Sequence, residues 1–182
     1  MRVLRVFDNA KIMKKYRTLD DVNWNLWEPE ERATLLFVIC GGKILLIEKK
    51  TGLGAGKING PGGRIEPGET PRECAIRELE EEVCVKPHGV LRVAELSFQF
   101  TDGYSLHGTI FTATDCEGEP TETREAVPFW VDLDKIPYER MWLDDIHWLP
   151  RVLAGEKVRG WFLFDGENRM MGHKVDTLKD DD

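Results

Sequence analysis

Residues 63–85 read GRIEPGETPRECAIRELEEEVCV, and this stretch decides the fold. It predicts a helix that begins after Thr70, because threonine is a good helix cap and Pro71 suits the first helical position. Glu73, three residues after the cap, completes a capping box. At about 100° per residue, one third of the helix circumference is apolar and the neighbouring third is acidic. The apolar positions are Ala75, Ile76, Leu79 and Val83, and the acidic ones are Glu78, Glu81 and Glu82.

The three glutamates on the acidic third should repel one another. Side chains three and four residues apart have Cβ atoms roughly 5–6 Å apart, so each ionised pair costs up to about 3 kcal/mol. Within the helix no basic residue follows them at four-residue spacing, and Arg77, the nearest cation, sits on a different azimuth beside the cluster. A divalent cation would relieve the repulsion, and oxygen ligands beside a glycine loop suit Mg²⁺. A merely solvated acidic face is the alternative interpretation.

The same stretch resembles the Nudix box, G-x5-E-x7-R-E-U-x-E-E-x-G-U, in which U is an aliphatic residue. Every fixed position matches except the last glycine, where this chain has Cys84. A residue with a Cβ resists the left-handed conformation, so we expect a strained or reshaped turn there, with the upstream carboxylates retained. The resemblance implies an α/β protein of the Nudix fold, with a mixed β-sheet in an α/β/α sandwich.

The resemblance also implies a metal site. Glu78, Glu81 and Glu82, together with the carbonyl group of Gly62, would bind Mg²⁺, for which Mn²⁺ is a substitute. Members of the family draw a further glutamate from a later loop, and Glu125 is the best candidate for it, with an ordinary surface charge as the alternative. Glu78 or one of its neighbours would accept a proton from the attacking water.

Further roles follow for residues around the box. Arg77 would orient the glutamates, and Glu69 would hold the loop against the helix. Lys49 and Arg64 are candidates for contacts with the phosphates, although each is equally well explained as an ordinary exposed cation. A triphosphate repels hydroxide, so the metal must neutralise it and activate a bound water, which leaves little other chemistry to the protein.

Stretches outside the box are similar to those of the 8-oxo-dGTP diphosphatases, the MutT-related nucleotide-pool sanitising enzymes of the vertebrate type. They read KKTGLGAGKINGPGG at 49–63, MWLDDIHWLP at 141–150 and RGWFLF at 159–164, and the resemblance covers residues 32–178.

This second resemblance implies a base pocket. Asn59 would hydrogen-bond the purine, Asp144 and Asp145 would read its Watson–Crick edge, and Trp142 would stack on the base. The chemistry is reasonable, because a carboxylate accepts from the N–H groups of guanine and indole offers a broad face. In the alternative interpretation the two aspartates cap the following helix and the tryptophan packs in the core.

The rest of the chain reads as strands with one more helix. We expect a hairpin over 34–50 that turns at Gly41-Gly42, a glycine loop over 51–69 with a short strand around 64–65, and a last hairpin that turns at Asp165-Gly166. Further strands are expected at 90–100, 105–115 and 128–133. A helix is expected over Asp145 to Leu153, ended by Gly155, and Phe98, Phe100 and Leu106 are plausible pocket walls.

Composition limits the remaining possibilities. The 182 residues carry 25 basic and 33 acidic side chains, a net charge of −8, which argues against binding to long nucleic acid. No apolar run approaches 18 residues, so neither a membrane span nor a signal peptide is expected, and we predict a cytoplasmic protein. The four cysteines form no C-x-x-C, and the four histidines are scattered, so each is expected to be a surface or packing residue.

The sequence therefore predicts a domain at 32–178, preceded by an extension of unknown role at 1–31 and followed by an acidic tail at 179–182. Its predicted function is Mg²⁺-dependent hydrolysis of oxidised purine nucleoside triphosphates such as 8-oxo-dGTP to the monophosphate and pyrophosphate. Alternatives are another nucleoside diphosphate derivative as substrate, such as a nucleotide sugar or a dinucleoside polyphosphate, or a catalytically silent nucleotide-binding module. Whether the protein is a monomer or a dimer stays open.

Overall fold

Strand β1 (Glu31–Cys40) lies at the centre of a mixed sheet in the computed structural model, which describes residues 16–52 and 54–179. It pairs in parallel with β7 (Ser105–Ala113), and on its other side it changes partner along its length. Its first half is antiparallel to β4 (Gly62–Arg64), and its end is antiparallel to β2 (Lys43–Lys49). One strand thereby joins the glycine loop to the rest of the sheet.

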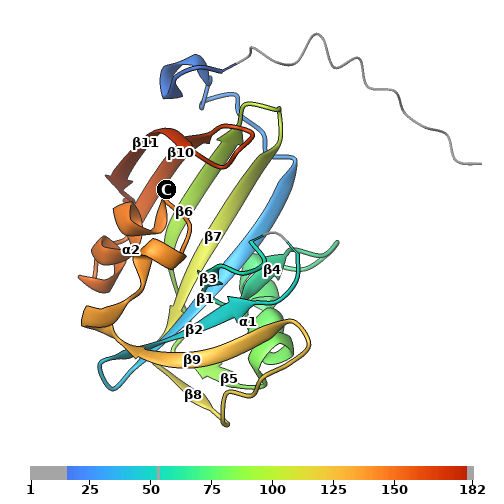
Figure 1. Ribbon diagram of the computed structural model, residues 1–182, viewed down its shortest axis with the longest axis vertical. Helices are drawn as coiled ribbons and strands as arrows, with labels where there is room; N and C mark the ends of the chain where they lie inside the picture. Colours follow the sequence, from blue (N-terminus) through green and yellow to red (C-terminus); the bar gives the residue numbers. More distant parts are fainter. Residues whose placement is uncertain (1–15, 53, 180–182) are drawn as a thin grey trace, which may run out of the picture.

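The full sheet has the strand order β11-β10-β6-β7-β1-β2-β3, with β4 on β1 and β9 on β2 (Figure 1). The pairs β1–β7 and β10–β6 are parallel and the others are antiparallel. The remaining strands of this sheet are β3 (Ile58–Asn59), β6 (Leu91–Phe100), β9 (Ala126–Asp132), β10 (Val158–Phe164) and β11 (Met170–Thr177).

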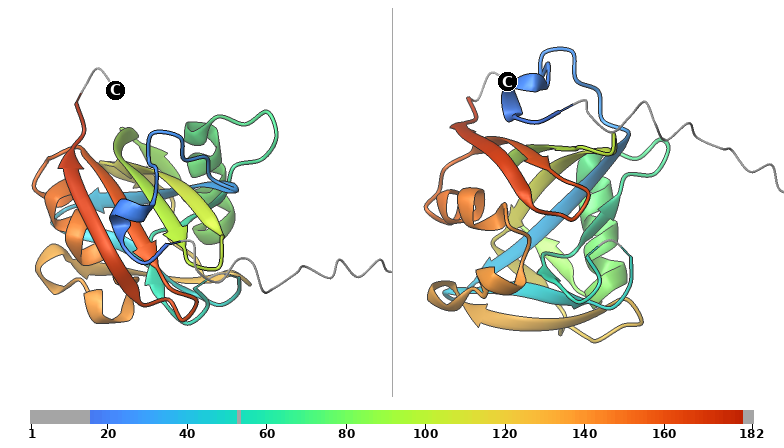
Figure 2. Two further views of the ribbon diagram at one scale, coloured as in Figure 1. Left: turned by 90° about the horizontal axis from the view of Figure 1, so that it is seen from above. Right: turned by 45° about the horizontal axis from the view of Figure 1, so that its top comes forward.

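Two helices cover opposite faces of this sheet, as the two views of Figure 2 show. Helix α1 (Pro71–Val83) packs its apolar side on Leu36 and Val38 of β1, whereas α2 (Asp145–Leu153) packs Trp148 and its neighbours on the face that carries Phe37. Alternate residues of a strand point to opposite faces, so β1 contributes to both cores. The α/β/α sandwich predicted from the sequence is confirmed.

Helix α1 begins and ends as its sequence predicts. The Thr70 hydroxyl accepts a hydrogen bond from the Glu73 N–H at 3.2 Å, and the Glu73 carboxylate accepts one from the Thr70 N–H at 2.8 Å. At the other end Cys84 has φ 64° and ψ 29°, a left-handed conformation in a residue that carries a Cβ. The strained turn expected at the position of the missing glycine is present.

The two predicted hairpins differ in how well the sequence located their turns. Gly41 and Gly42 both have positive φ, 57° and 75°, between Cys40 and Lys43, as expected. The last hairpin was predicted to turn at Asp165-Gly166; both residues lie in the turn, which spans 165–169, and Asn168 takes the positive φ of 60°. There the Asp165 carboxylate accepts two backbone N–H bonds, from residues 167 and 169, each at 2.9 Å.

Several short elements were not predicted. Strands β5 (Lys86–His88) and β8 (Asp115–Glu117) pair as a separate two-stranded sheet below α1 (Figure 1). The short strand expected around 64–65 lies at Gly62–Arg64, and a second one, β3, precedes it. The single-turn helices η1 (Leu19–Asp21), η2 (Leu133–Lys135) and η3 (Tyr138–Arg140) complete the described elements.

The described part of the N-terminal extension, residues 16–30, packs on the sheet. The Trp27 indole N–H donates to the Gln99 side-chain oxygen of β6 at 2.9 Å, and the Glu30 N–H donates to Ser105 of β7 at 3.0 Å. Val22 is buried. The other residues of the extension, 1–15, and residues 180–182 of the acidic tail lie outside the described residues.

Two histidines that looked isolated in the sequence meet in space. The rings of His147 on α2 and His173 on β11 stack with centroids 3.9 Å apart, and Phe162 lies 6.2 Å from His173. This is an aromatic packing contact between the helix and the sheet. Within the described residues, no helix has the length and apolar content needed to cross a membrane.

Candidate functional site

Glu82 is the most deeply buried of the three glutamates of α1. Its Oε2 accepts a hydrogen bond from the Gly62 N–H at 2.9 Å, and its Oε1 lies 3.7 Å from Lys49 Nζ. Burial raises the pKa of Glu82 to about 7, opposed by the Gly62 N–H and Lys49 and reinforced by the charges of Glu78 and Glu125. The structure thus brings a carboxylate, a lysine and a glycine strand together.

Arg77 ties the other two glutamates to the loop. Its Nη1 lies 2.8 Å from Glu78 and 3.1 Å from Glu81, and its Nε and Nη2 donate to both oxygens of Glu69, at 2.8 and 3.0 Å. The expectation that no cation relieves the repulsion is therefore wrong, because Arg77 directly precedes Glu78 and lies four residues before Glu81, so its guanidinium reaches both carboxylates. Its hydrogen bonds, helped by the Glu66 N–H, lower the pKa of Glu69 to about 2.

The glycines of β4 let the carboxylates approach the backbone. A Cβ built at Gly63 would lie 2.3 Å from the Glu78 carboxyl group, and one built at Gly62 would lie 2.0 Å from the Thr34 carbonyl oxygen. Any larger residue would push strand and helix apart. The glycine-rich composition of this loop thus reflects close packing against α1 and β1 as well as turn formation.

The atoms of this cluster that could bind a metal suit a hard dication. They are all oxygens, and their charges raise each other's proton affinity, as Glu82 shows. Thr123 donates to the carbonyl oxygen of Glu82 at 2.9 Å and thereby brings the loop that carries Glu125 to this end of α1. Among the residues that the structure describes, no three carboxylates, imidazoles or thiols already converge as a ligand set. Arg77 instead holds Glu78 and Glu81.

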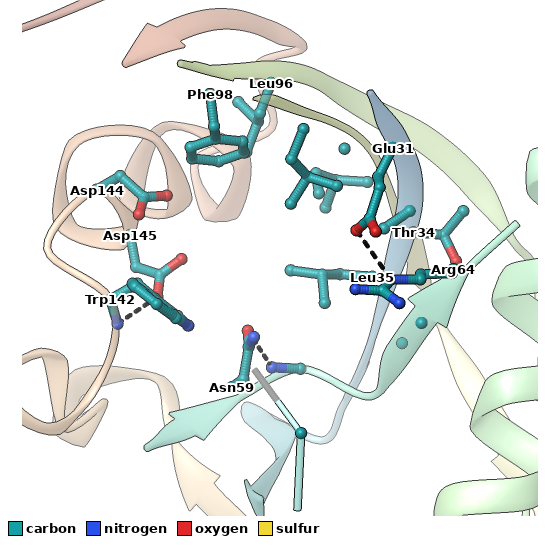
Figure 3. A pocket seen from close by; sticks show the side chains of 18 of the residues that line it. Glu31, Thr34, Leu35, Asn59, Arg64, Leu96, Phe98, Trp142, Asp144 and Asp145 are labelled. Atoms are coloured by element: carbon teal, nitrogen blue, oxygen red, sulfur yellow. Dashed lines mark hydrogen bonds and ion pairs between the residues drawn. The ribbon is translucent and has the colours of Figure 1, made fainter. Parts of the chain in front are cut away.

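Beside the carboxylates lies a cavity of about 350 Å³ over the face of the sheet opposite α1 (Figure 3). Its walls include Phe98, Phe100 and Leu106, as expected from the sequence, together with Leu35 of β1. Lys49, Asn59 and Arg64 also line it. A largely apolar cavity of this size with a few polar groups is typical of a small-molecule site.

Asp144 and Asp145 enter the cavity from the start of α2 (Figure 3). Both are buried; Asp144 accepts a hydrogen bond from the Trp148 indole at 3.0 Å, and Asp145 accepts one from the Trp142 N–H at 3.1 Å. Asp144 holds the N-cap position but its side chain makes no capping bond. Burial raises the pKa of both carboxyls, and the Asp144 charge raises that of Asp145 further.

The two tryptophans of this segment have different environments. Trp148 is fully buried against Phe37, with ring centroids 6.0 Å apart, so it is a core residue. Trp142 lines the cavity, with Lys57 Nζ 5.1 Å from its ring, and a Cβ at Gly54 would lie 3.1 Å from its indole nitrogen. Trp148 also borders the cavity, but its fully buried ring packs in the core.

Asn59 lies across the cavity from the two aspartates, on β3 (Figure 3). Its Oδ1 accepts the Gly60 N–H at 2.8 Å. Three further polar residues of the lining were missed in the sequence, namely Glu31, Thr34 and Tyr104. The signal for Glu31 was available, because it alternates with Ala33 and Leu35 along one strand and so shares their face.

The site thus places carboxylate oxygens of the kind that suit a dication beside a cavity of a size typical of a small-molecule site, an arrangement compatible with phosphoanhydride hydrolysis. This is the arrangement of a Nudix hydrolase. The chain belongs to that family, since the NUDIX domain model matches residues 29–152.

Comparison with known proteins gives close relatives. The oxidized purine nucleoside triphosphate hydrolase of Danio rerio is 41% identical over 150 residues, which cover 81% of this chain and 95% of the relative. The protein of the same name from Mus musculus is 37% identical, over 78% and 92% of the two chains. The mutator MutT protein of Bacillus halodurans has the same fold, with a TM-score of 0.71 and 24% identity over 80% of this chain and 97% of that one.

Proposed function

We propose that this protein hydrolyses oxidised purine nucleoside triphosphates such as 8-oxo-dGTP to the monophosphate and pyrophosphate, with Mg²⁺ as the metal, and so removes damaged nucleotides from the pool. The names of its relatives from fish and mouse support this proposal. We place the activity in residues 32–178, with residues 1–31 as an N-terminal extension of unknown role and residues 179–182 as an acidic tail. A cytoplasmic location stays a prediction.

The observation that carries the proposal is the pair of buried acids in the cavity. Two adjacent carboxyls whose pKa values are raised by burial can share a proton, so that together they present a donor and an acceptor. An oxidised purine differs from the normal base in where its donors and acceptors lie. Asp144, Asp145 and Asn59 together would match such an edge, while the Trp142 ring covers the base.

At the other end of the site the glutamates of α1 would hold the metal. When bound, Mg²⁺ neutralises the phosphates and lowers the pKa of its water. Glu78, Glu81 and Glu82 would supply the oxygen ligands, with the Gly62 carbonyl and Glu125 as further candidates. Lys49, already beside Glu82, and Arg64 on the cavity rim would contact the phosphates.

The proposal is tested by comparing kcat/KM for a panel of normal and oxidised nucleoside triphosphates, a nucleotide sugar and a dinucleoside polyphosphate, with and without Mg²⁺. We expect oxidised purine triphosphates to be preferred, and all turnover to require the metal. Preference for one of the other two compounds would overturn the assigned substrate. Nucleotide binding without any release of product would identify a catalytically silent module instead.

Glu78→Gln tests the carboxylate cluster directly. We expect at least a roughly 100-fold loss in kcat, since the variant loses a charged oxygen ligand or a general base. Glu80→Gln is the matched control, because Glu80 is exposed on the same helix and lies outside the cluster, and it should keep wild-type kcat. Equal activity of the two variants would contradict the metal-binding role of Glu78.

A further inference from the structure

The cavity has a second polar end that the proposed base contacts leave unused. There Arg64 Nε lies 2.8 Å from Glu31 Oε2, and the Tyr104 hydroxyl donates to the same oxygen at 2.7 Å. All three residues line the cavity. They come from three different elements, β4, β1 and the turn between β6 and β7, so the grouping exists only in the folded chain.

Glu31 keeps hydrogen-bonding capacity in this arrangement. An ionised carboxylate accepts at both oxygens, and here Arg64 and Tyr104 both occupy Oε2. Among the described residues none donates to Oε1, and the Glu31 side chain is 28% exposed. Burial and the neighbouring carboxylate raise the pKa of Tyr104 to about 12, so its hydroxyl stays a donor that fixes the carboxylate. A bound molecule can therefore donate to Oε1.

The position of this end relative to the rest of the site identifies its occupant. Figure 3 shows Glu31 and Arg64 across the cavity from Asp144, Asp145 and Trp142. Arg64 directly follows Gly63, whose backbone lies against the Glu78 carboxyl group. Successive residues of β4 point to opposite faces, so the Arg64 side chain lies on the cavity side of the strand that carries the metal-binding end.

In a nucleotide the sugar joins the base to the phosphates. With the base at the aspartates and the phosphates at the α1 carboxylates, the sugar must pass the rim between them, where Glu31 and Arg64 lie. A carboxylate is the group by which proteins commonly bind ribose hydroxyls, because both sugar hydroxyls are donors. A deoxyribose lacks the 2′ donor and would leave one such bond unmade.

We propose that Glu31, held in place by Arg64 and Tyr104, accepts a hydrogen bond from the 2′-hydroxyl of the bound nucleotide and so sets the protein's relative activity on oxidised ribonucleoside and deoxyribonucleoside triphosphates. This inference rests on the proposed function and adds a sugar-reading residue to it. The ribonucleotide has a 2′-hydroxyl that can donate to Glu31 Oε1, whereas the deoxyribonucleotide has none and leaves this acceptor without a partner.

The test compares kcat/KM for 8-oxo-GTP and 8-oxo-dGTP in the wild type and in Glu31→Gln, at a fixed Mg²⁺ concentration. The amide is isosteric but uncharged, so we expect the ribo-to-deoxy ratio to fall about 5-fold. Tyr104→Phe, which removes the hydroxyl that fixes the carboxylate, should lower the same ratio by about twofold to threefold. Glu30→Gln, an equal charge change at an exposed neighbouring position, should leave the ratio unchanged.

The outcomes separate the two levels of the proposal. Turnover of both nucleotides with an unchanged ratio in Glu31→Gln and Tyr104→Phe would overturn the sugar assignment and leave the proposed function standing. An equal loss on both substrates would show that Glu31 only supports the rim, and would also overturn the assignment. Failure of the wild type to hydrolyse either nucleotide would overturn the proposed function and this inference with it.

Discussion

At the scale of single residues, the carboxylates of this site have the same chemistry but different surroundings. Glu69 faces a guanidinium and is held ionised, with its pKa lowered to about 2, whereas burial raises the pKa values of Asp144 and Asp145, with Lys57 opposing the rise at Asp145. Glu82 is also buried and its pKa is raised, although Lys49 lies beside it. The surroundings therefore give the same functional group, a carboxylate, different roles. Glu69 is a structural anchor, and the others are candidates for binding the metal or the base.

The raised pKa values of the buried pair predict a pH dependence of stability. The folded chain binds protons at Asp144 and Asp145 at pH values where the unfolded chain, with ordinary aspartate pKa values near 4, has lost them. The free energy of unfolding should therefore fall as the pH rises from about 4 through the raised pKa values. Asp145→Asn removes one ionisation, and we expect about 1–2 kcal/mol more stability than the wild type at pH 7.

Denaturant unfolding at several pH values between 4 and 8 measures this effect. The amide keeps an oxygen that accepts the Trp142 N–H, so packing should be preserved. Asp134→Asn, at an exposed position, is the control and should show the wild-type pH dependence. If the free energy of unfolding changed with pH by the same amount in the wild type and in Asp145→Asn, burial would not be holding the two acids protonated.

At the scale of elements, helix α1 is specified almost entirely by its own sequence. The cap and the first proline fix its start, and the spacing of apolar residues fixes the face that packs. Its end is the exception, because Cys84 takes the left-handed conformation that glycine adopts without cost. The chain accepts this strain while keeping the Cys84 N–H bonded to the Glu80 carbonyl at 3.0 Å.

The strain predicts that Cys84→Gly stabilises the protein. Relief of the left-handed conformation should outweigh the extra flexibility of glycine in the unfolded chain, and we expect a gain of about 1 kcal/mol in the free energy of unfolding. Cys84→Ala keeps the Cβ and serves as the control, with no gain expected. Because Cys84 is exposed and its side chain lines neither the cavity nor the carboxylate cluster, kcat should not change. Equal stability of the two variants would mean that the turn is not strained.

At the scale of the whole molecule, the sheet connects the functional site to the N-terminal segment. Residues 16–30 rest on β6, β7, β10 and β11 at the end of the sheet where the chain enters β1. Trp27 is the main contact, with its indole bonded to Gln99 and its ring 5.5 Å from Trp24 and 6.4 Å from His107. This segment therefore adds packing contacts at this end of the sheet.

Trp27→Ala should lower stability with little effect on catalysis. Loss of a half-buried indole with one hydrogen bond costs about 1–2 kcal/mol, which corresponds to a fall in Tm of roughly 2–8 °C in a domain of this size. Thermal unfolding followed by circular dichroism measures the shift, and Trp27→Phe, which keeps a ring and loses the bond, should give a smaller one. An unchanged Tm in Trp27→Ala would show that the segment does not contribute to the stability of the fold.

The sequence by itself determined the elements and the residue types of the site. The Nudix box gave helix α1 and its carboxylates, the two-glycine turn gave the first hairpin, and alternation gave the long strands, because these patterns depend on neighbours in the chain. The sequence did not show that Asn168 takes the positive φ in the last turn, because a short polar residue occupies a position where glycine is more usual.

Only the tertiary structure decided which distant side chains meet and how they are charged. Arg77 reaches Glu69 of the glycine loop, and Glu31 meets Arg64 and Tyr104, through contacts between elements that no local pattern encodes. Burial likewise belongs to the assembled fold, because water is excluded from Asp144 and Asp145 only when the sheet, α2 and the glycine loop close around them. Local preferences select each element, but contacts between elements set the electrostatics of the site.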